Sequence, residues 1–396
     1  MPKTTLLLDL DDTLLDTNMD AFAPAYFSAL SGALADVVAP EVMLPALMGG
    51  TKAMMLSDDP ALTLSEVFGA YFFPRLGVVE RAALQERIER FYDETFPSIQ
   101  YVTRQRPEAV AFVEWAFAAG YRVAIATNPY FPLKAVHHRM RWAGLPPENY
   151  PFALVSSYET FHFTKETGAY FAEFLGQLGW PDGPVVMVGN DINMDLLPAQ
   201  RAGLPVFWMR EGRDESQPGI PQGSFADLRT WLEAADPQGL QPKLDTPEAI
   251  LASMRATPAV MSALAKGLPA DAWLRRPAPK EWCLTEILCH LRDVDAEVHL
   301  PRFQKMLAEE NPFLVGVESD RWAEARGYAQ QDGAQALADF TATRKTMLGL
   351  LNGLQAEWSR PARHAIFGST TLQELAGFIA EHDRLHIQQA WKTIHA

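Results

Sequence analysis

A pair of aspartates near the N-terminus is the first pattern in the chain that could do chemistry. In the segment LLLDLDDTLL, Asp9 and Asp11 directly follow a short apolar run. Open parallel sheets form their ligand sites at the carboxyl ends of their strands, so we expect both carboxylates to face one crevice. There, one carboxylate can attack as a nucleophile, while the other can donate a proton to a leaving oxygen and then activate water.

Three later segments carry polar residues that could reach the same crevice. Two contain apolar, strand-like runs, RVAIAT and VVMVG, and the third is the segment FTKET between them. Taken singly, each has an ordinary structural explanation, such as a strand end, a surface lysine or a solvated turn. The residues are Thr127 and Asn128 at the end of the first run, Lys165 in FTKET, and Asn190, Asp191 and Asp195 after the second run.

In this order, the four segments resemble the motifs of the haloacid dehalogenase superfamily. Its first motif, Asp-x-Asp-x-Thr, is matched by Asp9, Asp11 and Thr13. The resemblance implies that Asp9 attacks phosphorus and that Asp11 is the general acid and base. Because the dehalogenases of the family lack the second aspartate, Asp11 favours phosphoester cleavage.

The resemblance also assigns roles to the residues of the two middle segments. It implies that the Thr127 hydroxyl, with backbone N–H groups at Thr127 and Asn128, binds the phosphoryl oxygens. Lys165 would neutralise charge on the nucleophile and on the phosphoryl group. All of these roles serve the stabilisation of a highly charged transition state.

A magnesium site is a further implication of the resemblance. A hard cation takes oxygen ligands in near-octahedral geometry, and Asp9, the Asp11 carbonyl and an acidic residue after VVMVG would supply them. The family often carries an aspartate where Asn190 stands. We therefore assign the third ligand to Asp191, with Asn190 as an alternative and Asp195 as its support, and the sequence leaves open which of them contacts the metal.

Three histidines in the C-terminal part of the chain form a second candidate site. His382 and His386 lie four residues apart in AEHDRLHIQQ, so they share a helix face and could bind one metal ion. With His290 and the pattern around Trp282, they resemble the DinB-like superfamily of four-helix proteins. The resemblance implies a metal held by the three histidines. Neutral imidazoles suit zinc or nickel, with open positions for water or a thiolate.

The elements that must position the first site alternate between strand-like and helical patterns. This alternation predicts an α/β, Rossmann-like parallel sheet with helices on both faces. Residues from about 17 to 98 lack a strand pattern and predict a helical insert. The resemblance implies that this insert is the family's cap, and we expect its aromatic side chains to pack against one another. The expected strands are 5–8, 121–126, 152–156, 184–188 and 206–209, and the cap aromatics are Tyr26, Phe27, Phe68, Tyr71 and Phe72.

A loss of periodicity over residues 236–245, rich in proline and polar residues, indicates a linker. It separates a hydrolase domain at 1–235 from a second domain at 246–396. The sequence of the second domain predicts an all-α four-helix bundle, because long helical patterns follow one another without strand-like alternation. The four patterns are 246–266, 285–309, 334–354 and 371–394.

Composition indicates where the protein is located and which classes of partner it disfavours. The formal net charge of -15 disfavours binding to nucleic acid and to anionic membranes. Cys283 and Cys289, the only two cysteines, do not form a disulfide framework, and no stretch predicts a signal peptide or a membrane span. We therefore expect a cytoplasmic protein with a small-molecule substrate.

The leading functional hypothesis is a magnesium-dependent phosphomonoester hydrolase. It would act on a small phosphorylated metabolite through an aspartyl-phosphate intermediate, and it would be fused to a metal-binding bundle. A phosphomutase would use the same aspartates. In two further alternatives, the bundle carries the main function as a metal- and thiol-dependent transferase with a low-molecular-weight thiol, or it serves only as a binding or interaction module.

Overall fold

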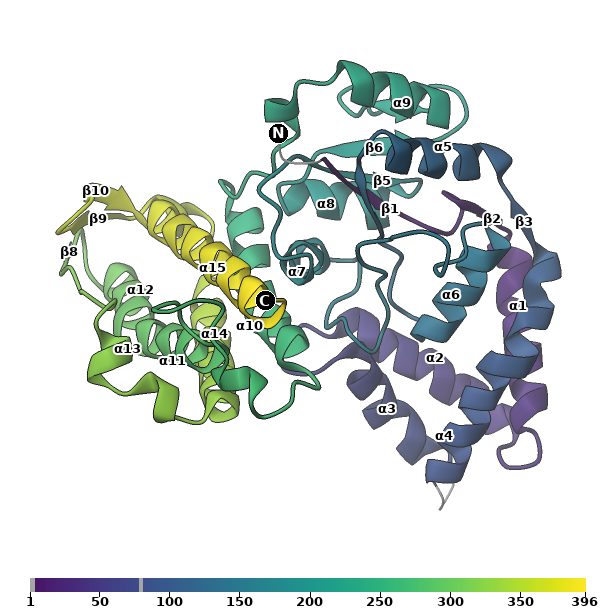
Figure 1. Ribbon diagram of the computed structural model, residues 1–396, viewed down its shortest axis with the longest axis horizontal. Helices are drawn as coiled ribbons and strands as arrows, with labels where there is room; N and C mark the ends of the chain where they lie inside the picture. The colour runs from purple at the N-terminus through teal and green to yellow at the C-terminus, as the bar shows by residue number, and fades with distance from the viewer. Residues whose placement is uncertain (1–3, 78–80) are drawn as a thin grey trace. The chain divides into compact units, whose positions relative to one another are not determined.

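The computed structural model describes residues 4–77 and 81–396, which divide into two units (Figure 1). The first unit contains the described residues up to Thr167, together with Pro181–Gln200 and Leu204–Pro242. The second unit contains Gly168–Trp180, Arg201–Gly203 and Lys243–Ala396. The second unit thus includes one helix, α7, that precedes three strands of the first unit in the sequence. Within the described ranges, every helix is too short or too polar to cross a lipid bilayer.

The first unit is built on a parallel sheet with the strand order β4-β1-β5-β6-β7. The strands of its centre are completely buried, because helices cover both faces and leave no side open to water. This confirms the predicted α/β fold class. The strands are β1 (Thr5–Leu8), β4 (Arg122–Ile125), β5 (Val185–Gly189), β6 (Val206–Met209) and β7 (Gln222–Gly223).

The strand expected at 152–156 forms only an isolated parallel bridge between Val155 and Ile125. The prediction of a regular strand there was wrong. The segment still lies along the edge of β4, where Ile125 N–H donates to Leu154 O at 2.9 Å. The Ser156 N–H also donates to Ile125 O at 3.1 Å, and its hydroxyl donates to Thr127 O at 2.7 Å.

Helices surround this sheet and also form a separate cap in the first unit. The cap begins and ends at a short antiparallel pair, β2 with β3, where Asp16 pairs with Arg104. A capping box at Thr63 and Glu66 fixes the start of α3. The cap contains α1 (Met19–Leu34), α2 (Pro40–Leu56), α3 (Leu64–Arg75) and α4 (Arg81–Arg90), and the helices of the sheet are α5 (Pro107–Ala118), α6 (Leu133–Trp142), α8 (Leu197–Arg201) and α9 (Phe225–Ala234), with β2 at Leu15–Thr17 and β3 at Thr103–Gln105.

The second unit is mainly helical, as predicted from the four long apolar patterns. Its α7 packs closely on α10, where Gly176 meets Val260 so tightly that a Cβ would come within 2.4 Å of the valine. A small sheet was not expected, because its strands are only two to four residues long. The main elements are α7 (Gly168–Gln177), α10 (Pro247–Ala265), α11 (Leu284–Val294), α12 (Leu300–Ala308), α14 (Gly333–Leu351) and α15 (Leu372–Ile394), with β8 (Phe313–Leu314), β9 (Pro361–His364) and β10 (Gly368–Thr371).

Candidate active site and metal centre

Asp9 lies at the carboxyl end of β1, in the middle of the parallel sheet. Its backbone N–H donates to Val188 O at 2.9 Å, which continues the pairing of β1 with β5. The side chain is 9% exposed. Because β1 lies between β4 and β5, the loops that follow all three strands meet at this edge of the sheet.

Lys165 joins two buried carboxylates at this edge. Its Nζ lies 2.6 Å from Asp9 Oδ1 and 2.6 Å from Asp195 Oδ1, and its side chain is 1% exposed. Burial, followed by the Asp195 charge, raises the pKa of Asp9 to about 7, although Lys165 opposes the shift. A single ammonium thus faces two carboxylates, and this surplus of negative charge suits an additional cation.

The three polar residues after β5 take different positions. Asn190 Oδ1 accepts a hydrogen bond from Thr13 Oγ1 at 3.1 Å. Asp191 is exposed, and its Oδ1 accepts from the Asn193 N–H at 2.7 Å, so this oxygen caps the following turn. Asp195 is buried, and its Oδ2 accepts from the Asp191 N–H at 3.0 Å. Asn190 and Asp195 therefore point towards the N-terminal motif, while Asp191 supports its own turn.

Asp11 is held by an arginine that the sequence analysis did not identify. Arg139 Nη1 lies 3.1 Å from Asp11 Oδ2, and Thr17 Oγ1 donates to Asp11 Oδ1 at 3.0 Å. Arg139 Nη2 also donates to Thr127 Oγ1 at 3.3 Å. The arginine side chain is 3% exposed, so it carries a buried positive charge between the acid/base candidate and the threonine at the end of β4.

The loop after β4 is connected to the segment that carries the lysine. Asn128 Oδ1 accepts from the Lys165 N–H at 3.2 Å. Two residues further, the Tyr130 hydroxyl donates to Glu166, and burial together with Glu166 raises the pKa of this tyrosine. These contacts position the Lys165 backbone. The Asn128 side chain therefore links the loop after β4 to the lysine segment.

His290, His382 and His386 meet in the second unit. His382 Nε2 lies 3.2 Å from His290 Nε2 and 3.1 Å from His386 Nε2. All three ligand nitrogens lie within 4.8 Å of one another. Nitrogens about 2.0 to 2.1 Å from a tetrahedral zinc ion are about 3.4 Å apart, so the observed spacing fits a shared metal.

The surroundings of the three histidines favour their neutral form. Burial, followed by the neighbouring His386, lowers the pKa of His290 to about 3, and burial also lowers the pKa of His382 and of His386. His386 Nδ1 lies 2.9 Å from Gln389 Oε1, which orients the ring with Nε2 towards the other histidines. The Trp282 ring stacks on His386 at 6.0 Å between centroids. The three rings therefore bring nitrogen ligand atoms to a common point.

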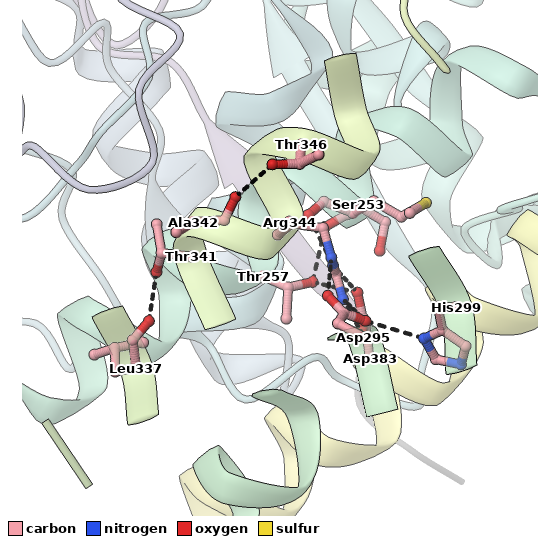
Figure 2. A network of polar contacts seen from close by, with 11 residues as sticks. Ser253, Thr257, Asp295, His299, Leu337, Thr341, Ala342, Arg344, Thr346 and Asp383 are labelled. Atoms are coloured by element: carbon pink, nitrogen blue, oxygen red, sulfur yellow. Dashed lines mark hydrogen bonds and ion pairs between the residues drawn. The ribbon is translucent and has the colours of Figure 1, made fainter. Parts of the chain in front are cut away.

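A buried ionic network connects the helices that carry the histidines (Figure 2). Arg344 on α14 is fully buried, and its guanidinium pairs with Asp295 at 2.8 Å and with Asp383 on α15. Thr257 on α10 donates to Asp383 Oδ2 at 2.9 Å, and His299 Nδ1 lies 3.0 Å from Asp295 Oδ1. Asp383 directly follows a candidate metal ligand. The network therefore fixes α15 relative to α10 and α14 at the level of the histidine group.

Family models match both parts of the chain. The family model described as haloacid dehalogenase-like hydrolase matches residues 3–203, which is half of the chain. The chain belongs to this family. It is therefore an enzyme of the hydrolase class, as the motifs predicted. In the C-terminal part of this haloacid dehalogenase-like hydrolase, residues 253–390 match the model of the DinB superfamily.

Individual relatives of this hydrolase are distant. The uncharacterized protein YuaE of Bacillus subtilis (strain 168) is 24% identical over 141 residues, covering 31% of this chain and 84% of its own. A 2-haloacid dehalogenase from Pseudomonas syringae pv. Tomato DC3000 is 25% identical with a TM-score of 0.42, over 59% of this chain and 99% of its own. YfiT from Bacillus subtilis, described as a probable metal-dependent hydrolase with an unusual four-helix bundle topology, is 18% identical with a TM-score of 0.36, over 39% of this chain and 89% of its own.

Two buried arginines of this hydrolase, Arg139 and Arg344, were missed in the sequence analysis. Each occupies a position that an apolar residue would fill in its helix. On α6, for example, Arg139 shares the buried face with Val136 and Met140. An arginine at an apolar helical position was the available signal, because a charged side chain is buried only when it is paired.

Proposed function

We propose that the first unit of this hydrolase is a magnesium-dependent phosphomonoester hydrolase with Asp9 as its nucleophile. The observation that carries the proposal is the buried Asp9–Lys165–Asp195 arrangement beside a second carboxylate, Asp11. An Asp9 oxygen attacks phosphorus, the bond to the leaving oxygen breaks, and an aspartyl phosphate forms. Lys165 balances the charge on Asp9 and on the phosphoryl group.

Asp11 supplies the proton transfers on either side of the intermediate. It donates a proton to the leaving oxygen and becomes a carboxylate, which the neighbouring Arg139 stabilises. This carboxylate then takes a proton from water, whose oxygen attacks phosphorus and releases Asp9 and inorganic phosphate. Thr127 and Asn128, at the end of β4, are proposed to bind the phosphoryl oxygens.

The residues at the sheet edge fit a magnesium ion because they offer oxygen donors and a surplus of buried negative charge. We propose that Asp9, the Asp11 carbonyl and one residue of the 190–195 turn would hold it. Bound magnesium would neutralise phosphoryl charge. Burial and proximity to Asp9 and Thr13 support Asp195 and Asn190 over Asp191, whose Oδ1 caps its own turn.

The proposal is tested by phosphate release from 4-nitrophenyl phosphate with and without magnesium. We expect turnover that requires both magnesium and Asp9. A phosphomutase would instead return the phosphoryl group to a second substrate position without net release of inorganic phosphate. Absence of phosphate release in the presence of magnesium would refute the hydrolase proposal.

For the second unit, we propose a metal site held by His290, His382 and His386, with zinc or nickel as the metal. The support is the 3.1 and 3.2 Å spacing of neutral imidazole nitrogens. Elemental analysis of the purified protein tests the site. A transfer assay with a low-molecular-weight thiol then separates a thiol-dependent transferase from a binding module, because only the former consumes thiol.

The proposed substrate is a small phosphorylated molecule, and the proposed location is the cytoplasm. The net charge of -15 supports the expectation that nucleic acid and anionic membrane surfaces are not partners. Cell fractionation with an antibody to the native protein tests the location. Recovery of the protein in a membrane pellet that resists salt washing would contradict it.

A further inference from the structure

The cap of the first unit contains a cavity of about 250 Å³ that the phosphoryl chemistry does not use. Its walls come from all four cap helices, from Tyr92 after α4, from the loop after β4 and from Tyr158. The lining is dominated by aromatic rings. They include Phe22, Tyr26 and Phe27 on α1, Phe68 and Phe72 on α3, and Phe131 in the loop.

The cavity offers few groups to a polar ligand. The lining residues include no acidic, basic or histidine side chain within the described part of the chain. The hydroxyls of Tyr26 and Tyr92 are 2.9 Å apart and bond to each other, and the Thr51 hydroxyl donates to Leu47 O. A sugar or a carboxylate placed here would lose its water without gaining matching partners, and this is unfavourable.

Contacts inside the first unit connect this cavity to the acid/base candidate. Arg139, which pairs with Asp11, has its guanidinium 5.0 Å from the ring centroid of Phe131. The same ring makes T-shaped contacts with Phe22 at 6.2 Å and with Tyr26 at 5.3 Å between centroids. The same loop begins at Thr127, the proposed phosphoryl-binding residue. The wall of the cavity is therefore one side chain away from the group that protonates the leaving oxygen.

We propose that this cavity holds the leaving group of the substrate and that this group is an apolar alcohol with a short chain or a single ring. The inference rests on the proposed phosphomonoesterase function. In the reaction, the P–O bond of the ester breaks, Asp11 protonates the departing oxygen, and the free alcohol remains among the aromatic rings. The volume is below the roughly 300 to 1,000 Å³ of sites for drug-sized ligands, so a small group fits.

The inference changes the expected substrate class. The sequence analysis treated the cap aromatics as packing residues, and four of the five, all except Tyr71, line the cavity. Small polar metabolite phosphates would leave the cavity without a matching partner. Each methylene group that enters an apolar site should instead improve binding about fourfold.

The test is a series of straight-chain alkyl phosphates, from methyl to hexyl phosphate, with glycerol 3-phosphate as the polar comparison. The alkyl leaving groups have similar intrinsic reactivity, so their kcat/KM values report the site. We expect kcat/KM to rise about fourfold for each added methylene until the cavity is full. Butyl phosphate should exceed glycerol 3-phosphate at least about tenfold. A flat series, or a preference for glycerol 3-phosphate, would overturn the inference.

Two substitutions on one helix sharpen this test. Phe68→Ala enlarges the cavity and should shift the optimum to longer chains. Tyr71→Ala is the matched control, because Tyr71 lies on the same helix, is also half-buried and does not line the cavity. The control should keep the original optimum. An equal shift in both variants would show a general loosening of the cap and would contradict a specific leaving-group site.

Acetyl phosphate separates this inference from the proposed function. Its leaving group is small and activated, so its hydrolysis needs little from the cavity. If acetyl phosphate is hydrolysed in an Asp9-dependent way while the alkyl series is flat, only the cavity inference fails. If no ester and no acetyl phosphate releases phosphate, the proposed function fails and the inference fails with it.

Discussion

Replacing Arg344 by methionine should strongly destabilise the second unit, because it leaves two buried carboxylates without their cation. Asp295 is 1% exposed and Asp383 is 0% exposed. Although burial opposes it, Arg344 helps to hold the pKa of Asp295 below its usual range. Burial raises the pKa of Asp383 even though Arg344 opposes the shift. Both carboxylates therefore depend on this guanidinium for their ionised form.

The free energy of unfolding of the second unit should fall by about 3 to 5 kcal/mol, the range for removing one partner of a buried ion pair. Hydrogen exchange measured by mass spectrometry suits a chain of two units, because peptides report each unit separately. Where exchange in α14 and α15 requires cooperative opening, it should become roughly 200- to 5,000-fold faster. Peptides from β1 should be unchanged. Arg384→Gln is the control, because it breaks a surface pair with Glu381 on α15 and should cost less than about 1 kcal/mol.

The loss of stability caused by Arg344→Met should become smaller at low pH and when the two unpaired carboxylates are replaced by amides. In the Arg344→Met variant, the unpaired carboxyls have raised pKa values in the folded state, so the stability they provide is present at low pH and is lost as the pH rises. The deficit should therefore shrink as the pH falls from 7 towards 4. Adding Asp295→Asn and Asp383→Asn should recover part of the loss. A cost below about 1 kcal/mol at pH 7, or no recovery in the triple variant, would refute the assignment of the cost to unpaired charge.

Three further outcomes are expected. Asp9→Asn should lower magnesium-dependent phosphate release at least about a thousandfold, because an amide is a poor nucleophile. The circular dichroism spectrum should be unchanged. Near-normal turnover would contradict the proposed role of Asp9 as nucleophile. Asp11→Asn should slow both phosphorylation and dephosphorylation of the enzyme by about 10²- to 10⁴-fold in single-turnover measurements, whereas unchanged rates would exclude it as the acid and base. His386→Ala should weaken metal binding at least about a hundredfold by elemental analysis after dialysis, since loss of a ligand should exceed the roughly 10- to 100-fold cost of losing a supporting residue. Phosphate release by the folded His386→Ala protein should persist, and its loss would show that the two sites depend on each other.

The fold classes could be predicted because each depends on local periodicity. Short apolar runs such as 5–8 and 185–189 are buried on both faces, and this requires a continuous apolar pattern that is visible in the sequence. The four long helices repeat every three to four residues and were visible for the same reason. The segment 152–156 was misread, because its composition resembles a strand while its pairing depends on a neighbouring strand.

The candidate sites were only partly predictable. Strand ends and helix faces indicate which side chains can meet, and this pointed to Asp9 with Asp11 and to His382 with His386. Lys165 and His290 were indicated by the family resemblances. The sequence assigned the metal contact to Asp191 with Asp195 as its support, whereas in the structure Asp191 is exposed and Asp195 is buried. That difference arises because the turn uses one carboxylate as its own cap and buries the other beside a lysine that lies 30 residues away in the chain.

The sequence by itself thus determined the two fold classes, the family of the hydrolase and the residue types available for chemistry, because these follow from local patterns and motif order. Only the tertiary structure decided the partners of the buried charges and the shape of the cap cavity. Arg344 and Asp295 are 49 residues apart, and Arg139 faces Asp11 across the first unit. Such contacts depend on how distant segments pack, since a buried charge must find its counter-ion wherever the fold places one.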